Sequence, residues 1–350
     1  MDRIVTKEHI SDFFHQGVNE LFVSNVYKKL NVSNGEIKKF KFIDLFAGIG
    51  GIRLPFEKLK GECVFTSEWD TSSQKTYFAN FGEIPYGDIN SIDVSEIPDH
   101  DILLAGFPCQ AFSVAGYRKG FEDTRGTLFF NIAKILDRNN PPRAFLLENV
   151  KGLENHDNGN TLSRMIEILE TLNYKVENKV LNSMTHANIP QNRERIFIIG
   201  IHKDYLKEPF SFPEKTKLNK TIHDFIDYRK QDEKYYYNNH KYYALLKKKI
   251  ISRDTIYQWR RGYVRENKNN VCPTLTANMG TGGHNVPIIL DDYGIRKLTP
   301  RECANFQGYD TKKFILPPLS DTKLYSQIGN SVTVPLVKRI ADKLIEYLEF

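Results

Sequence analysis

A cysteine on a constrained loop is the first residue of this 350-residue chain whose setting indicates chemistry. The apolar run from Asp101 to Ala105 predicts a short buried strand, which leads directly into Gly106-Phe107-Pro108-Cys109-Gln110-Ala111-Phe112-Ser113. Glycine frees the backbone and proline fixes φ, so Cys109 is expected just past a strand end. A thiol posed there can act as a nucleophile, whereas a structural cysteine more often lies inside the strand. Position alone leaves both interpretations open.

An acidic residue ends a second apolar strand. The run from Ala144 to Leu147 predicts this strand, and Glu148-Asn149-Val150 follows it. A carboxyl at the end of a buried strand is partly desolvated, which raises its pKa and makes it a proton donor near neutral pH. A helix N-cap or an ordinary salt bridge is the alternative role for Glu148.

Two arginines are expected at the same edge. Residues 175–182 and 195–200 predict a hairpin, so the second strand runs antiparallel. The segment Gln191-Asn192-Arg193-Glu194-Arg195 is predicted to lie in its loop, beside Cys109 and Glu148. Ligands of open α/β sheets bind at this edge, where the parallel strands end.

A glycine-rich turn follows the first predicted strand. This strand runs from Phe40 to Leu45 and leads into Phe46-Ala47-Gly48-Ile49-Gly50-Gly51, where glycines let the backbone approach a ligand. The turn is a weak signal alone, because it lacks the G-x-G-x-x-G dinucleotide pattern. Glu68, about 20 residues further on at the end of the strand 63–66, stands where nucleotide-binding folds hold ribose hydroxyls.

Two further residues extend this interpretation. Trp69 can lie against an adenine ring, and Asp88 is expected at the end of another strand, where its carboxylate can accept a hydrogen bond from an adenine amino group. Each acid alone is more often a turn residue, but acids after successive strands favour a nucleotide site.

Composition sets the broad class. The net charge of +6 fits a nucleic-acid partner and fits an ordinary basic protein equally well. Four widely spaced cysteines form no C-x-x-C pair, so neither a zinc site nor a disulfide framework is predicted. No apolar run is long enough for a bilayer and no secretory segment begins the chain, so we expect a cytoplasmic protein without a membrane partner.

The rest of the chain contains helices and a long basic segment. Amphipathic patterns predict helices near 126–137, 162–172, 301–307 and 335–348, and one or two helices in residues 1–40. Residues 116–125 predict a mobile loop that can close on a phosphate backbone. Residues 213–273 interleave tyrosines with Lys and Arg, which suits phosphate and base contact. Residues 273–285, rich in Gly, Thr and Asn, suit close approach to base edges.

Together the motifs resemble those of the DNA cytosine-5 methyltransferases, especially the bacterial type II restriction–modification type. The matching stretches occur in the family's order and are specific because several independent motifs agree. They are DLFAGIGG (Asp44–Gly51), GFPCQAFS (Gly106–Ser113), ENV (Glu148–Val150), QNRER (Gln191–Arg195), RECANFQGY (Arg301–Tyr309) and QIGNSV (Gln327–Val332). The likeness covers about residues 41–210 and 271–345.

The resemblance implies an α/β protein of two domains. Residues 41–210, completed by 322–350, would form the catalytic and cofactor-binding domain, with a Rossmann-like S-adenosylmethionine-dependent methyltransferase fold: a mostly parallel sheet with helices on both faces. Residues 211–321 would form a smaller, irregular target-recognition domain, and 1–40 an N-terminal helical arm that packs on the rest. DNA would lie between the two domains.

The resemblance also implies the cofactor S-adenosylmethionine, the product S-adenosylhomocysteine and no metal. Phe46 and the glycines would cradle the cofactor, Glu68 would take the ribose, and Trp69 would stack on adenine. The expected cofactor residues are Asp44, Phe46, Ala47, Gly48, Ile49, Gly51, Glu68, Trp69, Asp88, Ile89, Pro108, Leu128 and Asn330.

The implied reaction is methylation of C5 of a flipped-out cytosine in double-stranded DNA. Cys109 would add to C6, Glu148 would protonate or hydrogen-bond N3, Arg195 would hold O2, and Arg193 would help to order the site. The expected DNA contacts are Gln110, Ser113, Arg118, Arg125, Thr127, Arg260, Arg261, Thr274, Gly280, Gly282 and Gly283. The expected form is a monomer on DNA, with a cognate restriction endonuclease as a candidate genetic partner, and the resemblance implies a bacterial or phage origin.

Three alternatives are weighed against this interpretation. A tRNA-directed enzyme on the same core would have a shorter recognition segment and a different sequence after Cys-Gln. A non-catalytic DNA-binding relative would have lost the nucleophile or the acid, and both Cys109 and Glu148 are present. A nicotinamide-dependent dehydrogenase shares the nucleotide-binding layout but gives no reason for the Pro-Cys-Gln loop.

Overall fold

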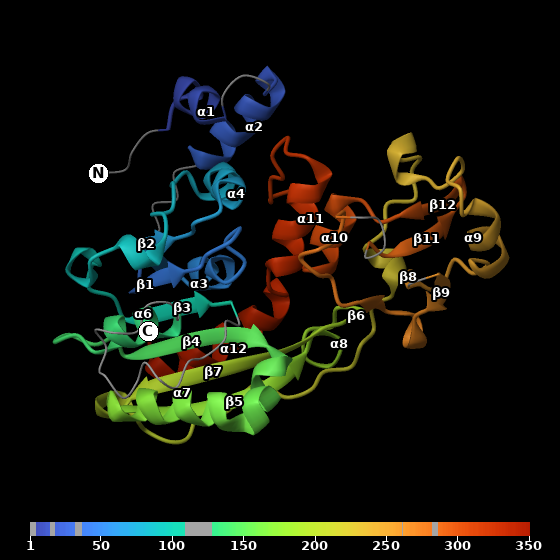
Figure 1. Ribbon diagram of the computed structural model, residues 1–350. Coiled ribbons are helices and arrows are strands. Elements are labelled where there is room, and N and C mark those ends of the chain that lie inside the picture. The colour runs from blue at the N-terminus through green and yellow to red at the C-terminus, as the bar shows by residue number, and fades with distance from the viewer. Residues whose placement is uncertain (1–4, 15–17, 32–36, 109–127, 261, 282–285) are drawn as a thin grey trace.

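A mixed, mainly parallel sheet forms the centre of the protein. The computed structural model describes residues 5–14, 18–31, 37–108, 128–260, 262–281 and 286–350, and within them six strands form a sheet of order β2-β1-β3-β4-β7-β5 (Figure 1). Strands β1 to β4 are parallel, and β7 is antiparallel to both β4 and β5. The strands are β1 (Phe40–Leu45), β2 (Gly61–Ser67), β3 (Ile102–Gly106), β4 (Ala144–Val150), β5 (Tyr174–Asn182) and β7 (Glu194–His202).

Helices cover both faces of this sheet, which explains why its central strands are continuous apolar runs. Alternate side chains of β1, β3 and β4 enter two separate cores. Phe42, Leu104 and Leu146 face α3 and α12, whereas Ile43 and Leu103 face α6 and α7. These helices are α3 (Arg53–Lys58), α6 (Leu128–Leu136), α7 (Asn160–Thr171) and α12 (Val334–Leu348).

A separate small antiparallel sheet lies on the other side of the molecule (Figure 1). Its strand order is β12-β11-β8-β9, and Tyr257, Trp259, Ile288 and Ile295 form an apolar cluster of their own with α9. Its strands are β8 (Tyr257–Arg260), β9 (Tyr263–Glu266), β11 (Ile288–Asp291) and β12 (Gly294–Lys297), and its helix is α9 (Tyr243–Lys249).

Helices α10 (Pro300–Phe306) and α11 (Asp321–Asn330) lie between the two sheets (Figure 1). Cys303, Phe306 and Ile328 belong to the same apolar cluster as α12, so this pair of helices packs on the large sheet's side. A short parallel pair, β6 (Gln191–Asn192) with β10 (Cys272–Pro273), also joins the two halves. The small α8 (Ser183–His186) precedes β6.

The N-terminal segment packs on the helix that follows β2. Helices α1 (Lys7–Phe14) and α2 (Glu20–Leu30) bury Ile10 and Val26 against Phe78 of α4 (Thr71–Phe81). The Lys29 amine donates to Asn80 Oδ1 at 2.5 Å and to the Lys313 carbonyl at 2.7 Å. The predicted helices in residues 1–40 are therefore confirmed, and they contact the rest of the chain by packing.

Two local predictions were wrong. Residues 84–88 form a single bridge, Ser67 with Tyr86, rather than a strand, and Asp88 caps a 3₁₀ turn by accepting from the Asn90 N–H. Gln191–Asn192 is a short strand rather than a loop, because Cys272–Pro273 supplies a pairing partner distant in sequence. The predicted antiparallel hairpin of β5 and β7 is confirmed. Within the described ranges, no helix is both long and apolar enough to cross a membrane.

Candidate functional site

The carboxyl ends of β1 to β4 meet at one edge of the large sheet. The strand order reverses between β1 and β3, since β1 pairs with β2 on one side and β3 on the other. Such a reversal leaves a crevice outside the strand ends, and ligands of open α/β sheets bind there. The glycine-rich turn, Glu68, Gly106 and Glu148 each stand at or just beyond the end of one of these four strands.

The glycine-rich turn after β1 leaves one backbone face open. Phe46 has φ of 55°, a left-handed conformation that is uncommon for a bulky residue and that concentrates at functional sites. Gly48 also has φ of 55°, and a side chain there would meet no atom within 4 Å. The turn thus holds an exposed strip of backbone that a ligand can approach closely.

Other predicted residues of this turn face inward. Ile49 is buried in the core, and a Cβ on Gly51 would meet Tyr309 and Ser331. Ala47 is buried, and its N–H donates to the Ser67 carbonyl at 2.9 Å, which ties the turn to the end of β2. These three residues shape the turn through packing, and their contact with a ligand stays a prediction.

Glu68 connects the turn to the helix that follows β2. Its Oε2 accepts from the Gly48 N–H at 2.8 Å and its Oε1 accepts from the Asp70 N–H at 2.7 Å. Burial raises the pKa of Glu68, while these backbone donors act in the opposite direction. Each oxygen keeps a second lone pair, so the carboxylate can still accept from hydroxyl groups of a ligand.

Asp44 is a buried carboxyl without a hydrogen-bond donor among the described residues. It lies in β1 next to Thr66 of β2, and both of its oxygens are unpaired, as are the hydroxyls of Thr66 and Ser67. Burial raises the pKa of Asp44 well above its usual value, and the Arg53 charge partly offsets this. Buried polar groups in proteins normally have partners, so this cluster below the turn fits a polar ligand or ordered water.

The remaining predicted cofactor residues surround the same edge. The Trp69 side chain is 76% exposed immediately after β2, so its ring is free to stack. Asp88 is exposed and Ile89 is buried beneath it. Pro108 and Asn330 are exposed at the ends of β3 and α11, and Leu128 begins α6 half-buried.

Glu148 and Arg195 form a buried pair at the end of β4. Val150 of β4 pairs with Arg195 of β7 in the antiparallel register. Glu148 lies two residues before Val150 on β4, so its side chain and that of Arg195 lie on the same face of the sheet. Arg195 Nε is 3.2 Å from Glu148 Oε1, yet this oxygen accepts no hydrogen bond from the described residues. Burial raises the pKa of Glu148, and Arg195 and then Arg193 offset part of that rise. The pair therefore offers a desolvated acid beside a fixed cation.

Arg193 has a different environment from Arg195. It is 1% exposed and donates to the carbonyls of Leu275, Gly329 and Ser331. Burial, and then repulsion from Arg195, lower the pKa of Arg193 to about 9, so the guanidinium stays charged at neutral pH. Arg193 therefore joins three distant segments behind the site, which supports its predicted ordering role.

The nucleophile candidate lies outside the described residues, as do Gln110, Ser113, Arg118, Arg125, Thr127, Arg261, Gly282 and Gly283. The chain leading to Cys109 is described as far as Pro108. Gly106 pairs directly with Glu148, and the Phe107 carbonyl accepts from Asn149 Nδ2 at 3.0 Å. The segment before Cys109 is thus fixed beside the Glu148–Arg195 pair.

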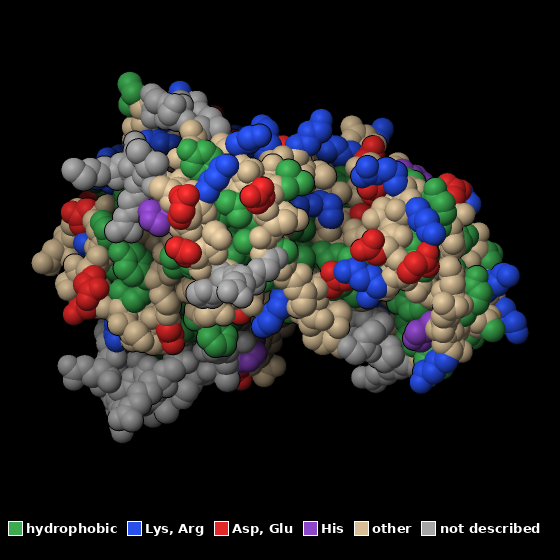
Figure 2. Space-filling model, turned by 90° about the horizontal axis from the view of Figure 1, so that it is seen from above, with side chains coloured by type: hydrophobic (Ala, Val, Ile, Leu, Met, Phe, Trp, Pro, Cys, Tyr) green, Lys and Arg blue, Asp and Glu red, His purple; other side chains and the backbone are tan. Residues whose placement is uncertain are grey.

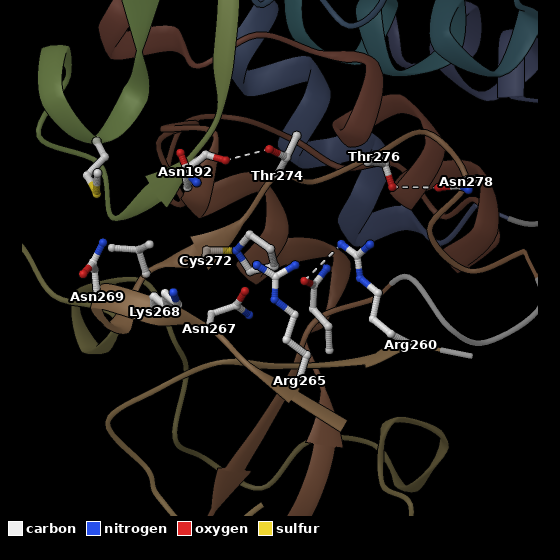
Figure 3. A pocket seen from close by; sticks show the side chains of 14 residues that line it. Asn192, Arg260, Arg265, Asn267, Lys268, Asn269, Cys272, Thr274, Thr276 and Asn278 are labelled. Atoms are coloured by element: carbon white, nitrogen blue, oxygen red, sulfur yellow. Dashed lines mark hydrogen bonds between the residues drawn. The ribbon is translucent and has the colours of Figure 1, made fainter. Parts of the chain in front are cut away.

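A polar groove separates the small sheet from the β6–β10 pair. It has a volume of about 480 Å³, and Figure 3 shows Arg260 and Arg265 opposite Asn192, Thr274 and Thr276. Its lining residues are Met184, Asn192, Gln258, Arg260, Arg265, Asn267, Lys268, Asn269, Val271, Cys272, Pro273, Thr274, Thr276 and Asn278. None of the described residues that line the groove is acidic, so the groove suits an anionic ligand.

Of the predicted DNA contacts, Arg260 and Thr274 line this groove. Thr274 Oγ1 donates to the Asn192 carbonyl at 2.6 Å. Gly280 instead packs against Tyr325 and Thr322 of α11 with φ of 79°. Sequence reasoning counted Arg265 among the basic residues suited to DNA contact but missed Gln258. The alternation of apolar and polar residues in Tyr257-Gln258-Trp259-Arg260 was an available signal for one polar strand face.

Comparison with known proteins assigns the chain to a family. Residues 40–346 match the C-5 cytosine-specific DNA methylase family. The chain is 52% identical over 306 residues to the type II methyltransferase M.Bsp6I of Bacillus sp., covering 86% of this chain and 96% of that protein. It is 44% identical over 329 residues to M.HpaII of Haemophilus parainfluenzae, covering 89% and 90%.

The fold is that of the same class of enzyme. The crystal structure of S. pombe Dnmt2 methyltransferase matches with a TM-score of 0.70 at 21% identity, covering 89% of this chain and all of that one. The protein therefore has an α/β methyltransferase fold. The chain belongs to the C-5 cytosine-specific DNA methylase family, and it is a DNA cytosine-5 methyltransferase.

Proposed function

We propose that the protein is a sequence-specific methyltransferase of the type II restriction–modification kind, which transfers a methyl group from S-adenosylmethionine to C5 of a flipped-out cytosine. Its role would be to protect host DNA from a cognate endonuclease. The buried Glu148–Arg195 pair at the end of β4, beside the strand that leads to Cys109, carries this proposal. The similarity to the type II methyltransferases M.Bsp6I and M.HpaII supports it.

Cysteine addition would activate the base. C5 of cytosine is a poor nucleophile within the aromatic ring, and a bond from Cys109 Sγ to C6 makes it enamine-like. Glu148 would give its proton to N3 as that bond forms, because burial keeps the proton on the carboxyl at higher pH. Arg195 would donate to O2 and stabilise the same developing charge. The activated C5 would then accept the methyl group, and S-adenosylhomocysteine would be released. Loss of the C5 proton to a base or water would expel the thiolate, and N3 would return its proton to Glu148, which restores the aromatic ring.

The residues at the ends of β1 and β2 fit the proposed cofactor, whose bound sulfonium would supply an electrophilic methyl group. The open backbone at Gly48 admits a close ligand, and Glu68 keeps free acceptor positions for ribose hydroxyls. Trp69 offers an exposed ring for adenine, and the unpaired Asp44 carboxyl supplies acceptors below the turn. Asp88 and Ile89 would contact the adenine edge.

Residues 211–321 are proposed as the target-recognition unit. The separate apolar cluster of the small sheet and α9 supports this assignment. Figure 2 shows Lys and Arg side chains dispersed over the face seen from above, with acidic side chains among them. The acid-free groove is therefore the more specific indication of where the small sheet contacts DNA.

Bisulfite sequencing of DNA from cells that express the protein tests the activity and locates the target together. Cytosines within one recurring short sequence should be protected from conversion, and cells expressing Glu148→Gln should show none. Absence of protected cytosines with the wild-type protein, or protection confined to RNA, would refute the proposed function.

Replacing Glu148 with glutamine should lower kcat by about 10²- to 10⁴-fold, the usual contribution of a positioned general acid. An acid must carry its proton to act, so wild-type activity should be full below the pKa of Glu148 and fall as pH rises through it. Because burial raises the pKa of Glu148, this fall in activity, the alkaline limb of the pH profile, should lie closer to neutral pH. The pH profile of kcat for Glu148→Gln should lack that limb.

Two results would contradict the assigned role of Glu148. One is an unchanged alkaline limb in Glu148→Gln, and the other is a loss of activity explained by unfolding, measured as a lower thermal midpoint. Glu154, a residue of the exposed 3₁₀ segment after β4, provides a matched glutamine control and should leave kcat unchanged.

Replacing Glu68 with glutamine should weaken S-adenosylmethionine binding about 10- to 100-fold, because hydrogen bonds to a charged acceptor contribute about 1.5–3 kcal/mol. The variant also loses part of the anchor that holds the Gly48 N–H. Titration calorimetry measures the dissociation constant directly. Glu62→Gln, an exposed carboxylate of the same strand β2, is the control. Equal affinity of Glu68→Gln and wild type would remove Glu68 from the cofactor site.

A further inference from the structure

The hairpin of β8 and β9 presents two chemically different faces. Tyr257 and Trp259 enter the apolar cluster with α9, so the alternate residues Gln258 and Arg260 point to the opposite face. Arg265 lies directly opposite Gln258 in the antiparallel register. The face of the hairpin that lines the groove therefore carries two guanidinium groups with an amide between them (Figure 3).

Neither guanidinium is neutralised by the part of the chain that the structure describes. Among the described residues, no carboxylate lies within ion-pair distance of Arg260 or Arg265. Most arginines of the described residues do have a carboxylate partner at that distance. Arg260 Nη2 lies 3.4 Å from Gln258 Oε1, a long hydrogen bond to a side chain that is itself buried. Gln258 thus accepts a hydrogen bond that positions the Arg260 guanidinium, and the N–H groups of Arg265 remain available to a ligand.

The opposite wall of the groove is uncharged. Asn192 belongs to β6, Thr274 and Thr276 follow β10, and Thr274 already donates a hydrogen bond to the Asn192 carbonyl. Arg260, Arg265 and Lys268 are therefore the charged donors in the groove, and of these only the arginines present a planar fork of N–H groups to acceptors of a ligand. Guanine is the base that presents two acceptors, N7 and O6, on one edge in the major groove, matching the fork of an arginine. Adenine presents one acceptor and one donor there, which suits an amide better.

We propose that this groove is the guanine-reading site of the protein: Arg260 and Arg265 donate to N7 and O6 of guanine in the DNA target, and Gln258 acts as the positioning residue for Arg260. The proposal rests on the proposed function, since it takes double-stranded DNA as the ligand. It goes further by naming the base and the atoms that the small sheet recognises.

Substituted DNA tests the proposal directly. The target sequence is first located by selecting bound duplexes from a random DNA pool, which does not depend on methyl transfer. Each of its guanines is then replaced in turn by 7-deazaguanine, which lacks the N7 acceptor, and equilibrium affinity is measured at fixed salt. At one or more positions the wild type should lose about 5- to 150-fold in affinity, the range for a bidentate base contact. Arg265→Ala or Arg260→Ala should lose a similar factor on ordinary DNA and little more on the 7-deazaguanine DNA.

Lysine variants separate base reading from charge. Arg265→Lys keeps the positive charge but loses the planar fork, so it should bind non-specific DNA as the wild type does while losing its preference for the target. Gln258→Leu should reduce sensitivity to N7 at the guanine that Arg260 reads and leave the other positions unchanged. Arg253→Ala, whose guanidinium pairs with Asp292 outside the groove, should retain both affinity and preference.

The opposite pattern would overturn the proposal. If both arginine variants weaken specific and non-specific DNA equally, with a smaller salt slope and no effect of N7, the groove contacts phosphate instead. Because affinity is measured rather than methyl transfer, the two proposals fail separately. A protein that discriminates against 7-deazaguanine but never methylates refutes only the proposed reaction, and one that methylates without sensing N7 refutes only the groove.

Discussion

Replacing Cys109 with serine should abolish methyl transfer, by at least about 10⁴-fold, because removal of a covalent nucleophile typically costs that much or more. A serine hydroxyl stays protonated near neutral pH and is far less nucleophilic than a thiolate. DNA and cofactor affinity should remain, since neither depends on the covalent bond. A filter-binding assay in parallel with a methyl-transfer assay measures both properties on the same preparation.

The environments of the other three cysteines strengthen this prediction. Burial raises the pKa of Cys63 to about 12 and the pKa values of Cys272 and Cys303 well above their usual range, so none of these thiols ionises near neutral pH. The Cys63 thiol is also occupied, since it donates to the Phe65 carbonyl. Cys63→Ser is accordingly the matched control and should keep activity within a few-fold of wild type.

A trapping experiment identifies the nucleophile without a mutation. DNA with 5-fluorocytosine at the target carries fluorine where the proton must leave, so the final elimination stops and the bond to the protein persists. Peptide mapping should find that bond on Cys109. An adduct on any other residue, or retained methyl transfer by Cys109→Ser, would show that the proposed covalent route is wrong.

The sequence predicts the catalytic edge well because local patterns place its residues there. Each apolar strand is short and buried, and a parallel strand must deliver its last residue to the same edge as its neighbours. Glu148 and the segment before Cys109 therefore meet through topology alone, as the pairing of Gly106 with Glu148 shows. The position of the glycine-rich turn at this edge is predictable for the same reason, because it follows the last residue of β1.

The contacts that the sequence does not predict join segments far apart in the chain. Arg193 was expected in a loop, yet its charge is buried against the carbonyls of Leu275, Gly329 and Ser331, which lie 82 to 138 residues away. Gln191 and Asn192 form a strand only because Cys272 and Pro273 pair with them. The segment around Asp88 forms a bridge instead of a strand, since its own residues make too few ladder bonds.

A second unpredicted feature is the buried charge cluster that holds the small sheet. Arg296 of β12 is fully buried and donates to Asp291 Oδ2 at 2.6 Å and to both oxygens of Glu302 at 2.8 Å. Its remaining N–H groups donate to the carbonyls of Lys297 and Asp227, so all five donors are used. Glu302 also caps the start of α10 through the Thr299 N–H. Arg296 thus joins the small sheet to a helix that packs with the large one.

Replacing Arg296 with methionine should therefore destabilise the protein by about 3–5 kcal/mol, because two buried carboxylates lose their counter-charge. The thermal midpoint should fall on the order of 5–10 °C, measured by differential scanning fluorimetry. Arg253→Met provides the control. Its ion pair with Asp292 lies on the neighbouring turn, but both side chains are more than half exposed, and exposed pairs contribute about 0–1 kcal/mol.

Removing all three charges together tests whether the lost counter-charge is what destabilises the protein. Arg296→Met combined with Asp291→Asn and Glu302→Gln leaves no uncompensated buried charge, so the triple variant should regain part of the lost stability. If Arg296→Met alone shifts the midpoint no more than Arg253→Met, the cluster does not stabilise the fold. Because the β8–β9 hairpin pairs with β11, whose last residue is Asp291, loosening this cluster should also displace the groove. Arg296→Met should then lose DNA discrimination at temperatures below its midpoint, while Arg253→Met retains it.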